Sequence, residues 1–245
     1  MKIQCMGWIF LISLVVLEGY GSIATGSEAM SENRYARQRE QMVERQLAAR
    51  GISDPRVLEA FREVKRHRFV PSHYREFSYT DQPLSIGYNQ TISQPYIVAF
   101  MTEALDPEKD EKVLEVGTGS GYQAAILAKL CGSVYSIEII EKLGESARQL
   151  LQELGYNNVH VKVGDGYQGW PGHAPFDAII VTCSPVEVPQ PLKEQLAEGG
   201  RMIIPIGRKF SQELVLLRKT EGELHEESVL PVRFVPMVDE QGKRY

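Results

Sequence analysis

The sequence predicts an α/β fold, in which a doubly wound, mostly parallel sheet of seven strands carries a terminal antiparallel hairpin and N-terminal helices. Five apolar runs of strand length alternate with helical stretches between residues 112 and 206, which is typical of a parallel sheet covered on both faces. A glycine-rich loop joins the first of these strands to the following helix. Two further strand-like runs follow the fifth strand with no helix between them, which favours an antiparallel hairpin.

Composition and charge narrow the class of protein. The chain has 245 residues, 43% of them hydrophobic and 24% charged, which is typical of a globular domain and excludes a disordered or fibrous chain. The formal net charge of −5 argues against a basic nucleic-acid-binding face, so we expect no nucleic-acid partner. The three cysteines and five histidines show no metal-ligand spacing, so we expect no metal.

The first 29 residues differ in composition from the rest of the chain. Lys2 precedes an apolar run from Met6 to Leu17, and small residues follow, which is the layout of a secretory signal peptide. The run is too short for a comfortable membrane span, and we expect no stable span after residue 29. A start codon assigned too far upstream of a cytosolic protein is the alternative interpretation.

Residues 30–105 are predicted to form an N-terminal helical region that also binds substrate. Gly51 is a natural stop for the first helix, and Asp54 with Pro55 is a typical helix start. We expect helices over residues 31–50, 54–64 and 97–105, and a loop over residues 69–89.

Residues 106–220 are predicted to form the α/β core, and residues 221–245 a C-terminal strand and tail. The expected parallel strands are residues 112–116, 133–137, 159–163, 177–182 and 201–206. The expected intervening helices are residues 123–130, 141–154 and 191–197. The expected hairpin strands are residues 213–219 and 229–235, separated by a charged turn around residues 221–223.

The loop Glu115-Val116-Gly117-Thr118-Gly119-Ser120-Gly121-Tyr122 lies directly between a predicted strand and a predicted helix. Glycines at such a position let the backbone turn tightly and approach a ligand closely. Glu138 ends the second strand, where a carboxylate can accept hydrogen bonds from ribose hydroxyls. Asp165 and Gly166 follow the third strand, where Asp165 can accept a hydrogen bond from an adenine amino group. The pattern therefore predicts a site for a nucleoside cofactor.

The cofactor class follows from two residues of this loop. A dinucleotide site requires a small residue where this chain has Tyr122, and Glu115 would lie unfavourably beside a pyrophosphate. A carboxylate at Glu115 instead suits a ligand with an ammonium group, which favours S-adenosylmethionine, with S-adenosylhomocysteine as product. A dinucleotide-dependent oxidoreductase, a tight turn without a ligand and a non-catalytic binding module remain as alternatives.

The segment from Pro83 to Met101, PLSIGYNQTISQPYIVAFM, resembles the protein-L-isoaspartate O-methyltransferase family of class I methyltransferases. Residues 68–71 and 182–185 also resemble that family, and the similarity runs from about Met42 to Val238. The resemblance implies a Rossmann-like methyltransferase fold and methyl transfer from S-adenosylmethionine to the α-carboxylate of L-isoaspartyl residues. Another methyltransferase acting on a small molecule or RNA is the nearest alternative.

The resemblance implies that Ser93 is the active-site residue. Because a carboxylate is already ionised at neutral pH, we expect the Ser93 hydroxyl to orient the substrate rather than act as a nucleophile. An N-cap for the helix that starts near Pro95 is the alternative role for Ser93. The cofactor positions that the resemblance implies are Glu115, Gly117, Thr118, Gly119, Glu138, Asp165 and Gly166.

Substrate recognition is expected to depend mostly on the peptide backbone, because isoaspartate forms in many sequence contexts. Extended segments can pair with such a peptide as an added strand, and the predicted substrate-binding residues are Ile86, Gln90, Thr91, Ile92, Val188 and Pro189. Isoaspartyl proteins and peptides are the expected partners of a monomeric enzyme. S-adenosylmethionine is held inside the cell, so we expect a cytoplasmic location, with export as the alternative that residues 1–29 raise.

Overall fold

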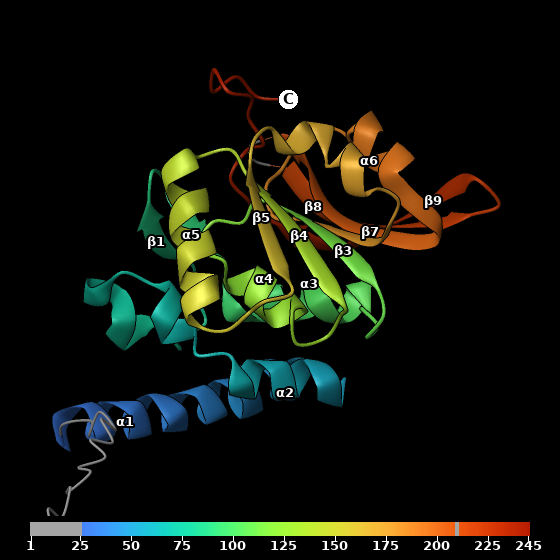
Figure 1. The fold of residues 1–245 in the computed structure, drawn as a ribbon. Coiled ribbons are helices and arrows are strands. Elements are labelled where there is room, and N and C mark those ends of the chain that lie inside the picture. The colour runs from blue at the N-terminus through green and yellow to red at the C-terminus, as the bar shows by residue number, and fades with distance from the viewer. Residues whose placement is uncertain (1–25, 209–210) are drawn as a thin grey trace, which may run out of the picture.

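The computed structural model describes residues 26–208 and 211–245, and it contains one seven-stranded sheet with helices on both faces (Figure 1). The strand order is β5-β4-β3-β6-β7-β8-β9, with β3 to β7 parallel and β8 and β9 antiparallel. The predicted fold class is therefore confirmed. The strands are β3 (Lys112–Val116), β4 (Ser133–Glu138), β5 (Val159–Val163), β6 (Phe176–Val181), β7 (Leu196–Arg208), β8 (Ser211–Thr220) and β9 (Glu223–Val232).

The central strands are buried on both faces, and their side chains alternate between two apolar clusters. Val113 and Ile180 face the cluster beneath the N-terminal helices, whereas Leu114 and Ile179 face the cluster on the α6 side. This alternation explains why the central strands read as continuous apolar runs. The helices that follow the core strands are α4 (Tyr122–Leu127), α5 (Glu141–Glu153) and α6 (Gln190–Gln195).

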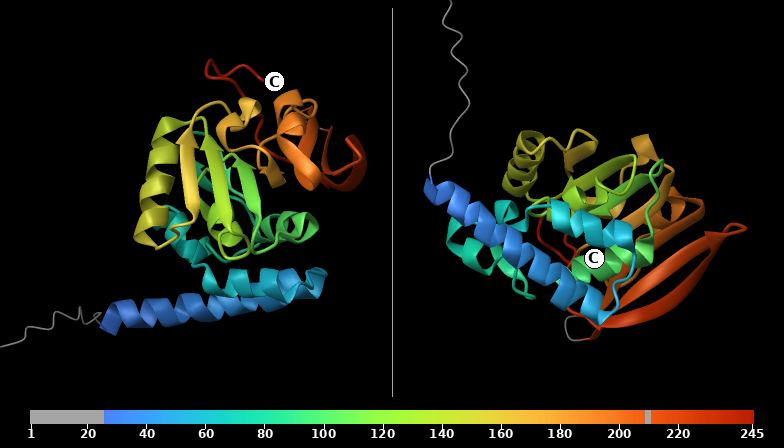
Figure 2. Two further views of the ribbon diagram at one scale, coloured as in Figure 1. Left: turned by 45° about the vertical axis from the view of Figure 1, so that its right-hand side comes forward. Right: turned by 90° about the horizontal axis from the view of Figure 1, so that it is seen from below.

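The N-terminal helices form an outer layer that packs across α3 and α4 (Figures 1 and 2). They are α1 (Gly26–Met42), which continues through π and 3₁₀ turns to Arg50, and α2 (Pro55–Glu63), while α3 (Pro95–Leu105) lies between them and the sheet. Gly51 ends the first of these at a φ of 98°, and the Asp54 side chain caps α2 by accepting a hydrogen bond from the Arg56 amide at 2.7 Å. Both predicted boundary residues are confirmed.

The signal-like segment predicted over residues 1–29 lies mostly outside the described residues, which begin at residue 26 with α1. Within residues 26–208 and 211–245, no helix is both long enough and apolar enough to cross a membrane.

The predicted loop over residues 69–89 is wrong in its last part, because a β-hairpin lies there. Strand β1 (Leu84–Gly87) pairs with β2 (Gln90–Ile92), and the turn residues Tyr88 and Asn89 have φ values of 51° and 56°. Positive φ at both turn positions is typical of a type I′ hairpin turn. An aromatic residue rarely adopts this conformation, so Tyr88 concealed the turn in the sequence.

The predicted last strand, residues 229–235, is also misplaced, because β9 begins at Glu223 and ends at Val232. It pairs with β8 alone and ends the sheet, so its exposed residues include Glu226 and Glu227. An edge strand tolerates charged side chains that interrupt the apolar pattern. The predicted boundary at residue 220 falls in the turn between β8 and β9, so the last segment contributes a strand to the core sheet.

Arg201 on β7 holds the C-terminal end of α3 against the sheet. Its guanidinium donates to the Leu105 carbonyl at 2.5 Å and to both carboxylate oxygens of Glu111 at 2.5 and 2.8 Å. Burial raises the pKa of Glu111, but the hydrogen bonds from Arg201 and the Glu108 amide, together with the positive charge of Arg201, outweigh burial, and the pKa lies below its ordinary value. The ionised pair therefore stabilises the folded state.

Glu111→Gln is expected to lower the free energy of unfolding at neutral pH by about 1–2 kcal/mol, because a charge-assisted hydrogen bond becomes a weaker one. The pKa of Glu111 is lower in the folded protein than in the unfolded chain. The contribution is therefore fully present above the unfolded pKa of about 4.3 and is lost as the pH falls through the folded value. Urea unfolding of the unmodified protein and the Glu111→Gln variant between pH 7 and pH 4 measures the difference in their free energies of unfolding. This difference should become smaller toward pH 4. A difference that stays constant with pH would contradict the role of charge.

Candidate active site

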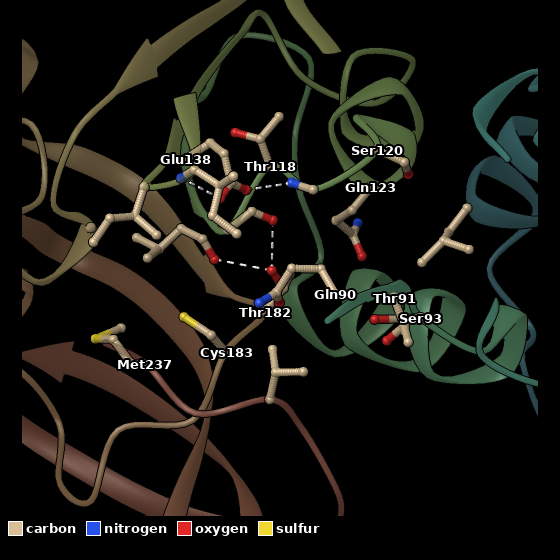
Figure 3. Close-up of a pocket in the computed structure, with 18 of the residues that line it drawn as sticks. Gln90, Thr91, Ser93, Thr118, Ser120, Gln123, Glu138, Thr182, Cys183 and Met237 are labelled. Carbon is tan, nitrogen blue, oxygen red and sulfur yellow. Dashed lines mark hydrogen bonds between the residues drawn. The ribbon is translucent and has the colours of Figure 1, made fainter. Parts of the chain in front are cut away.

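The main cavity lies at the carboxyl ends of β3, β4 and β6, where open α/β sheets bind ligands (Figure 3). Four segments that are distant in sequence line it: residues 90–93, 116–120, 137–140 and 235–238. Glu138 and Thr118 lie on one side of this space, and Thr91 and Ser93 on the other. The cavity thus joins the glycine loop to the segment that contains Ser93.

The glycine loop passes so close to β6 that Gly117 has no room for a side chain. Gly117 has a φ of 99°, and a Cβ there would overlap the hydroxyl of Thr182. That hydroxyl, at the end of β6, donates to the carbonyls of Val116 at 3.1 Å and Gly117 at 2.7 Å (Figure 3). Gly119 also has a positive φ, of 53°. The loop geometry therefore depends on glycine and leaves its backbone open toward the cavity.

Glu138 is the one acidic side chain among the described residues that line the main cavity. Its carboxylate accepts hydrogen bonds from the amides of Gly119 at 2.7 Å and Ile140 at 3.0 Å (Figure 3). Burial raises the pKa of Glu138, and these amides partly offset that effect. Each carboxylate oxygen has a second lone pair, so Glu138 can still accept hydrogen bonds from a ligand hydroxyl.

Glu115 does not line the cavity but lies fully buried beneath the glycine loop. The Ser136 hydroxyl donates to its carboxyl group, and the Ser136 and Thr118 hydroxyls are 2.5 Å apart. Burial raises the pKa of Glu115 to about 8, so at neutral pH the carboxyl group is mostly protonated. The structure therefore gives Glu115 contacts that support the loop, while its Oε1 atom accepts no hydrogen bond from the described residues. A contact of Glu115 with a ligand ammonium group stays a prediction.

Asp165 and Gly166 follow β5, as the sequence predicted. Gly166 lines the cavity, and a Cβ there would overlap the Val116 side chain. The Asp165 carboxylate is outside the lining and accepts hydrogen bonds from the Tyr167 amide at 3.0 Å and from the Tyr245 hydroxyl. An adenine contact of Asp165 stays a prediction.

Ser93 faces the cavity directly before α3, and its hydroxyl makes no hydrogen bond with any described residue. The N-cap of α3 is Gln94, whose side chain makes no capping bond, so the alternative role of Ser93 as an N-cap is wrong. The Ser93 carbonyl accepts a hydrogen bond of 2.8 Å from Arg66. Ser93 is therefore held through its backbone, and its side chain is available to a ligand.

Arg66 is a buried cation that the sequence reasoning did not identify. It is fully buried, donates to the Ser78 carbonyl at 2.8 Å and lies over the Tyr122 ring. Burial lowers the pKa of Arg66 to about 10, which still leaves it charged at neutral pH. Arg66 begins a short 3₁₀ helix, Arg66–Phe69, and no sequence signal indicates its role, because its partners come from distant segments.

The predicted substrate-binding residues divide into two groups. Gln90, Thr91 and Ile92 line the main cavity through the β1–β2 hairpin. Ile86 lies beside Gly119, where an added Cβ would be 3.4 Å from its side chain, whereas Val188 and Pro189 are buried before α6. The structure therefore brings half of the predicted set to the cavity, and the contacts with a peptide stay predictions.

Several lining residues have no counterpart among the predicted site residues. Thr182 and Cys183 follow β6, and their position at the end of a parallel strand was a usable signal. Burial raises the pKa of the Cys183 thiol to about 12, so it is neutral. Residues 235–238 reach the cavity from the C-terminal tail, which no local pattern indicates. In the described part of the chain, no group of three or more His, Cys, Asp or Glu residues is placed to hold a metal ion.

Comparisons with known proteins agree on one family. A family model described as protein-L-isoaspartate(D-aspartate) O-methyltransferase matches residues 37–242. A curated relative named protein-L-isoaspartate O-methyltransferase, from Opitutus terrae, is 54% identical over 216 residues, covering 88% of this chain and 93% of the relative. Protein-L-isoaspartate O-methyltransferase 1 from Nitrosospira multiformis is 48% identical over 236 residues, covering 95% of this chain and 98% of the relative.

Solved structures give the same result for the fold. A protein-L-isoaspartate O-methyltransferase is 34% identical, with a TM-score of 0.77, over 83% of this chain and 67% of that protein. A Plasmodium falciparum protein described as a member of the same enzyme class, in complex with S-adenosyl-L-homocysteine, is 26% identical. Its TM-score is 0.70 over 83% of this chain and 97% of that protein.

Gly166→Ala is expected to weaken S-adenosylmethionine binding by roughly tenfold or more, because the new Cβ overlaps Val116 at the cavity wall. Gly172→Ala is the matched control, since a Cβ there meets no atom within 4 Å and neither glycine has a positive φ. Titration calorimetry with S-adenosylmethionine measures both variants. Equal affinities for the two would show that the close approach at Gly166 does not shape the cofactor site.

Proposed function

The chain belongs to the protein-L-isoaspartate(D-aspartate) O-methyltransferase family, and from that membership we propose which of its residues perform the reaction. Its activity is methyl transfer from S-adenosylmethionine to the α-carboxylate of L-isoaspartyl residues in damaged proteins and peptides. The resemblance read from the sequence is confirmed by this membership. The alternatives of a small-molecule or RNA methyltransferase and of a dinucleotide-dependent oxidoreductase are not favoured.

We propose that S-adenosylmethionine is held by the glycine loop, Glu138 and Gly166. Two observations support this assignment: the Glu138 carboxylate faces the cavity with lone pairs free for ribose hydroxyls, and Gly117 and Gly166 cannot carry a side chain without overlap. Thr118, Gly119 and Asp165 remain assigned to the cofactor. We assign Glu115 to support of the loop from below through Ser136.

Bound S-adenosylmethionine supplies a methyl group that is attached to a positively charged sulfur. An ionised carboxylate that accepts this methyl group becomes a methyl ester, and S-adenosylhomocysteine is the product left behind. The isoaspartyl carboxylate needs no general base, because it is ionised at neutral pH. The chain must instead orient this carboxylate and exclude water around it. Buried apolar side chains in the cavity wall, Val98 and Met101, serve the exclusion of water.

The observation that carries the proposal is the free Ser93 hydroxyl across the cavity from Glu138 (Figure 3). We assign Ser93 to orient the substrate carboxylate by donating a hydrogen bond to it. Arg66 is a positioning residue, because it fixes the Ser93 backbone without facing the substrate. Gln90, Thr91 and Ile92 are assigned to the peptide on either side of the isoaspartyl residue.

Location and assembly remain proposals. The cofactor is available in the cytoplasm, so we place the enzyme there, with export as the alternative. We propose that it acts as a monomer on isoaspartyl proteins and peptides and does not bind nucleic acid, consistent with the net charge of −5.

Ser93→Ala is expected to lower kcat by roughly 10- to 100-fold, because a misoriented carboxylate rarely reaches the methyl carbon. The affinity for S-adenosylmethionine should change little, since Ser93 lies across the cavity from Glu138 (Figure 3). The assay measures transfer of labelled methyl groups to an isoaspartyl peptide, with the matched aspartyl peptide as control. Transfer to both peptides, or to neither, would contradict the proposed activity. Ser72→Ala, which removes an exposed hydroxyl outside the cavity, is the control variant.

Glu138→Ala is expected to raise the dissociation constant for S-adenosylmethionine by roughly tenfold or more, because charge-assisted hydrogen bonds to the ribose are lost. Calorimetry measures this constant directly. Glu145→Ala, which removes an exposed carboxylate of α5 outside the cavity, should bind like the unmodified enzyme. Unchanged binding in Glu138→Ala would remove this residue from the cofactor site.

A further inference from the structure

A second cavity, of about 460 Å³, lies beside the main cavity and is lined by three arginines. Arg208 ends β7, Arg233 follows β9, and Arg244 belongs to the C-terminal tail. Val186, Phe234 and Pro236 form apolar parts of its wall. We call this space the arginine cavity.

The three guanidinium groups are exposed and make no ion pair or side-chain hydrogen bond with any residue the structure describes. Among the described residues that line the arginine cavity, none has an acidic side chain. Arginine stays charged at any physiological pH, and its planar guanidinium group binds carboxylates with two parallel hydrogen bonds. The carboxyl group of Tyr245, the last residue of the sequence, also lies at this wall, where its oxygen accepts a hydrogen bond of 3.2 Å from the Val186 amide. Three guanidinium groups still give the cavity an excess of positive charge, and it is suited to an anionic ligand.

The position of the arginine cavity relates it to the substrate. Strand β7 runs parallel to β6, so Arg208 at its carboxyl end lies at the same edge of the sheet as the main cavity. Pro236 lines both cavities, and a bridge to Ser184 fixes the extended segment that contains it. The two cavities therefore adjoin at Pro236.

The size and lining favour a stretch of polypeptide over a small free anion. A volume of about 460 Å³ far exceeds the space of roughly 30 Å³ that one water molecule occupies. Val186 is a large apolar residue with 47% of its surface exposed, and it offers contact to the aliphatic part of a Glu side chain. The net charge of −5 means that the long-range field repels acidic peptides, so any attraction must be local.

We propose that the arginine cavity is a specificity subsite that binds acidic residues on one flank of the isoaspartyl residue. This inference rests on the proposed function. Because the cavity lies on one side of the main cavity, carboxylates on only one flank of the substrate reach the arginines. The subsite favours isoaspartyl sites within acidic stretches of damaged proteins.

The test compares three isoaspartyl peptides that are identical except for three flanking residues. One peptide carries Glu before the isoaspartyl residue, one carries Glu after it, and one carries Gln on both sides. At low ionic strength we expect kcat/KM to be about tenfold higher for one Glu peptide than for the Gln peptide, mainly through KM. The preference should shrink as salt rises, because these charges are partly exposed.

The variant Arg208→Gln, Arg233→Gln and Arg244→Gln should lose the preference and keep the kcat/KM of the unmodified enzyme on the Gln peptide. Thermal unfolding and S-adenosylmethionine affinity confirm that this triple variant is folded. The comparison among peptides with the unmodified enzyme does not depend on any variant folding.

A matched control removes three exposed arginines elsewhere, as Arg37→Gln, Arg45→Gln and Arg218→Gln. Arg37 and Arg45 lie on the α1 side, away from the C-terminal end (Figure 1), and Arg218 pairs with Arg201 at the other end of the β7–β8 ladder from Arg208. This control should keep the preference.

The outcomes separate the inference from the proposed function. Equal kcat/KM for all three peptides, or an equal gain from Glu on both flanks, would overturn the subsite and leave the methyltransferase activity standing. The subsite would also be contradicted if the control variant lost the preference for the Glu peptide as fully as the variant of the arginine cavity. If the unmodified enzyme methylates none of the three peptides, that result would contradict both the proposed function and the subsite.

Discussion

The close approach of the loop after β3 to the end of β6 is the constraint on which the site depends. The loop can follow this path only because Gly117 has no side chain, and Thr182 fixes it by donating to the two carbonyls on that side. The same path brings the Gly119 amide to Glu138, which orients the carboxylate toward the cavity. The cofactor side of the site therefore follows from backbone packing between parallel strands.

The substrate side of the site depends on a buried cation, Arg66, that lies between segments of irregular backbone. Arg66 donates to the carbonyls of Ser78 and Ser93 and lies over the ring of Tyr122 at the start of α4. Irregular backbone must have its polar groups satisfied when it is buried, and a single guanidinium satisfies two of them. This arrangement couples the Ser93 segment to the sheet and leaves the Ser93 hydroxyl free for the substrate.

Charge is distributed unequally over the two cavities. The main cavity carries Glu138, while Glu115 beneath it is mostly protonated because it is buried. The arginine cavity carries three arginine side chains and, in the part of the chain that the structure describes, no acidic one. A cationic cofactor and an acidic peptide would thus meet complementary charge in adjoining spaces, although the chain as a whole is negative.

The sequence by itself determined the fold class, the cofactor class and the Ser93 segment. Apolar periodicity, the glycine loop and Glu138 at a strand end are local patterns with one structural solution. Only the tertiary structure decided that Glu115 is buried beneath the glycine loop, that Arg66 binds the Ser93 backbone and that residues 235–238 line the cavity. These features depend on which distant segments meet, and neither spacing nor composition encodes that.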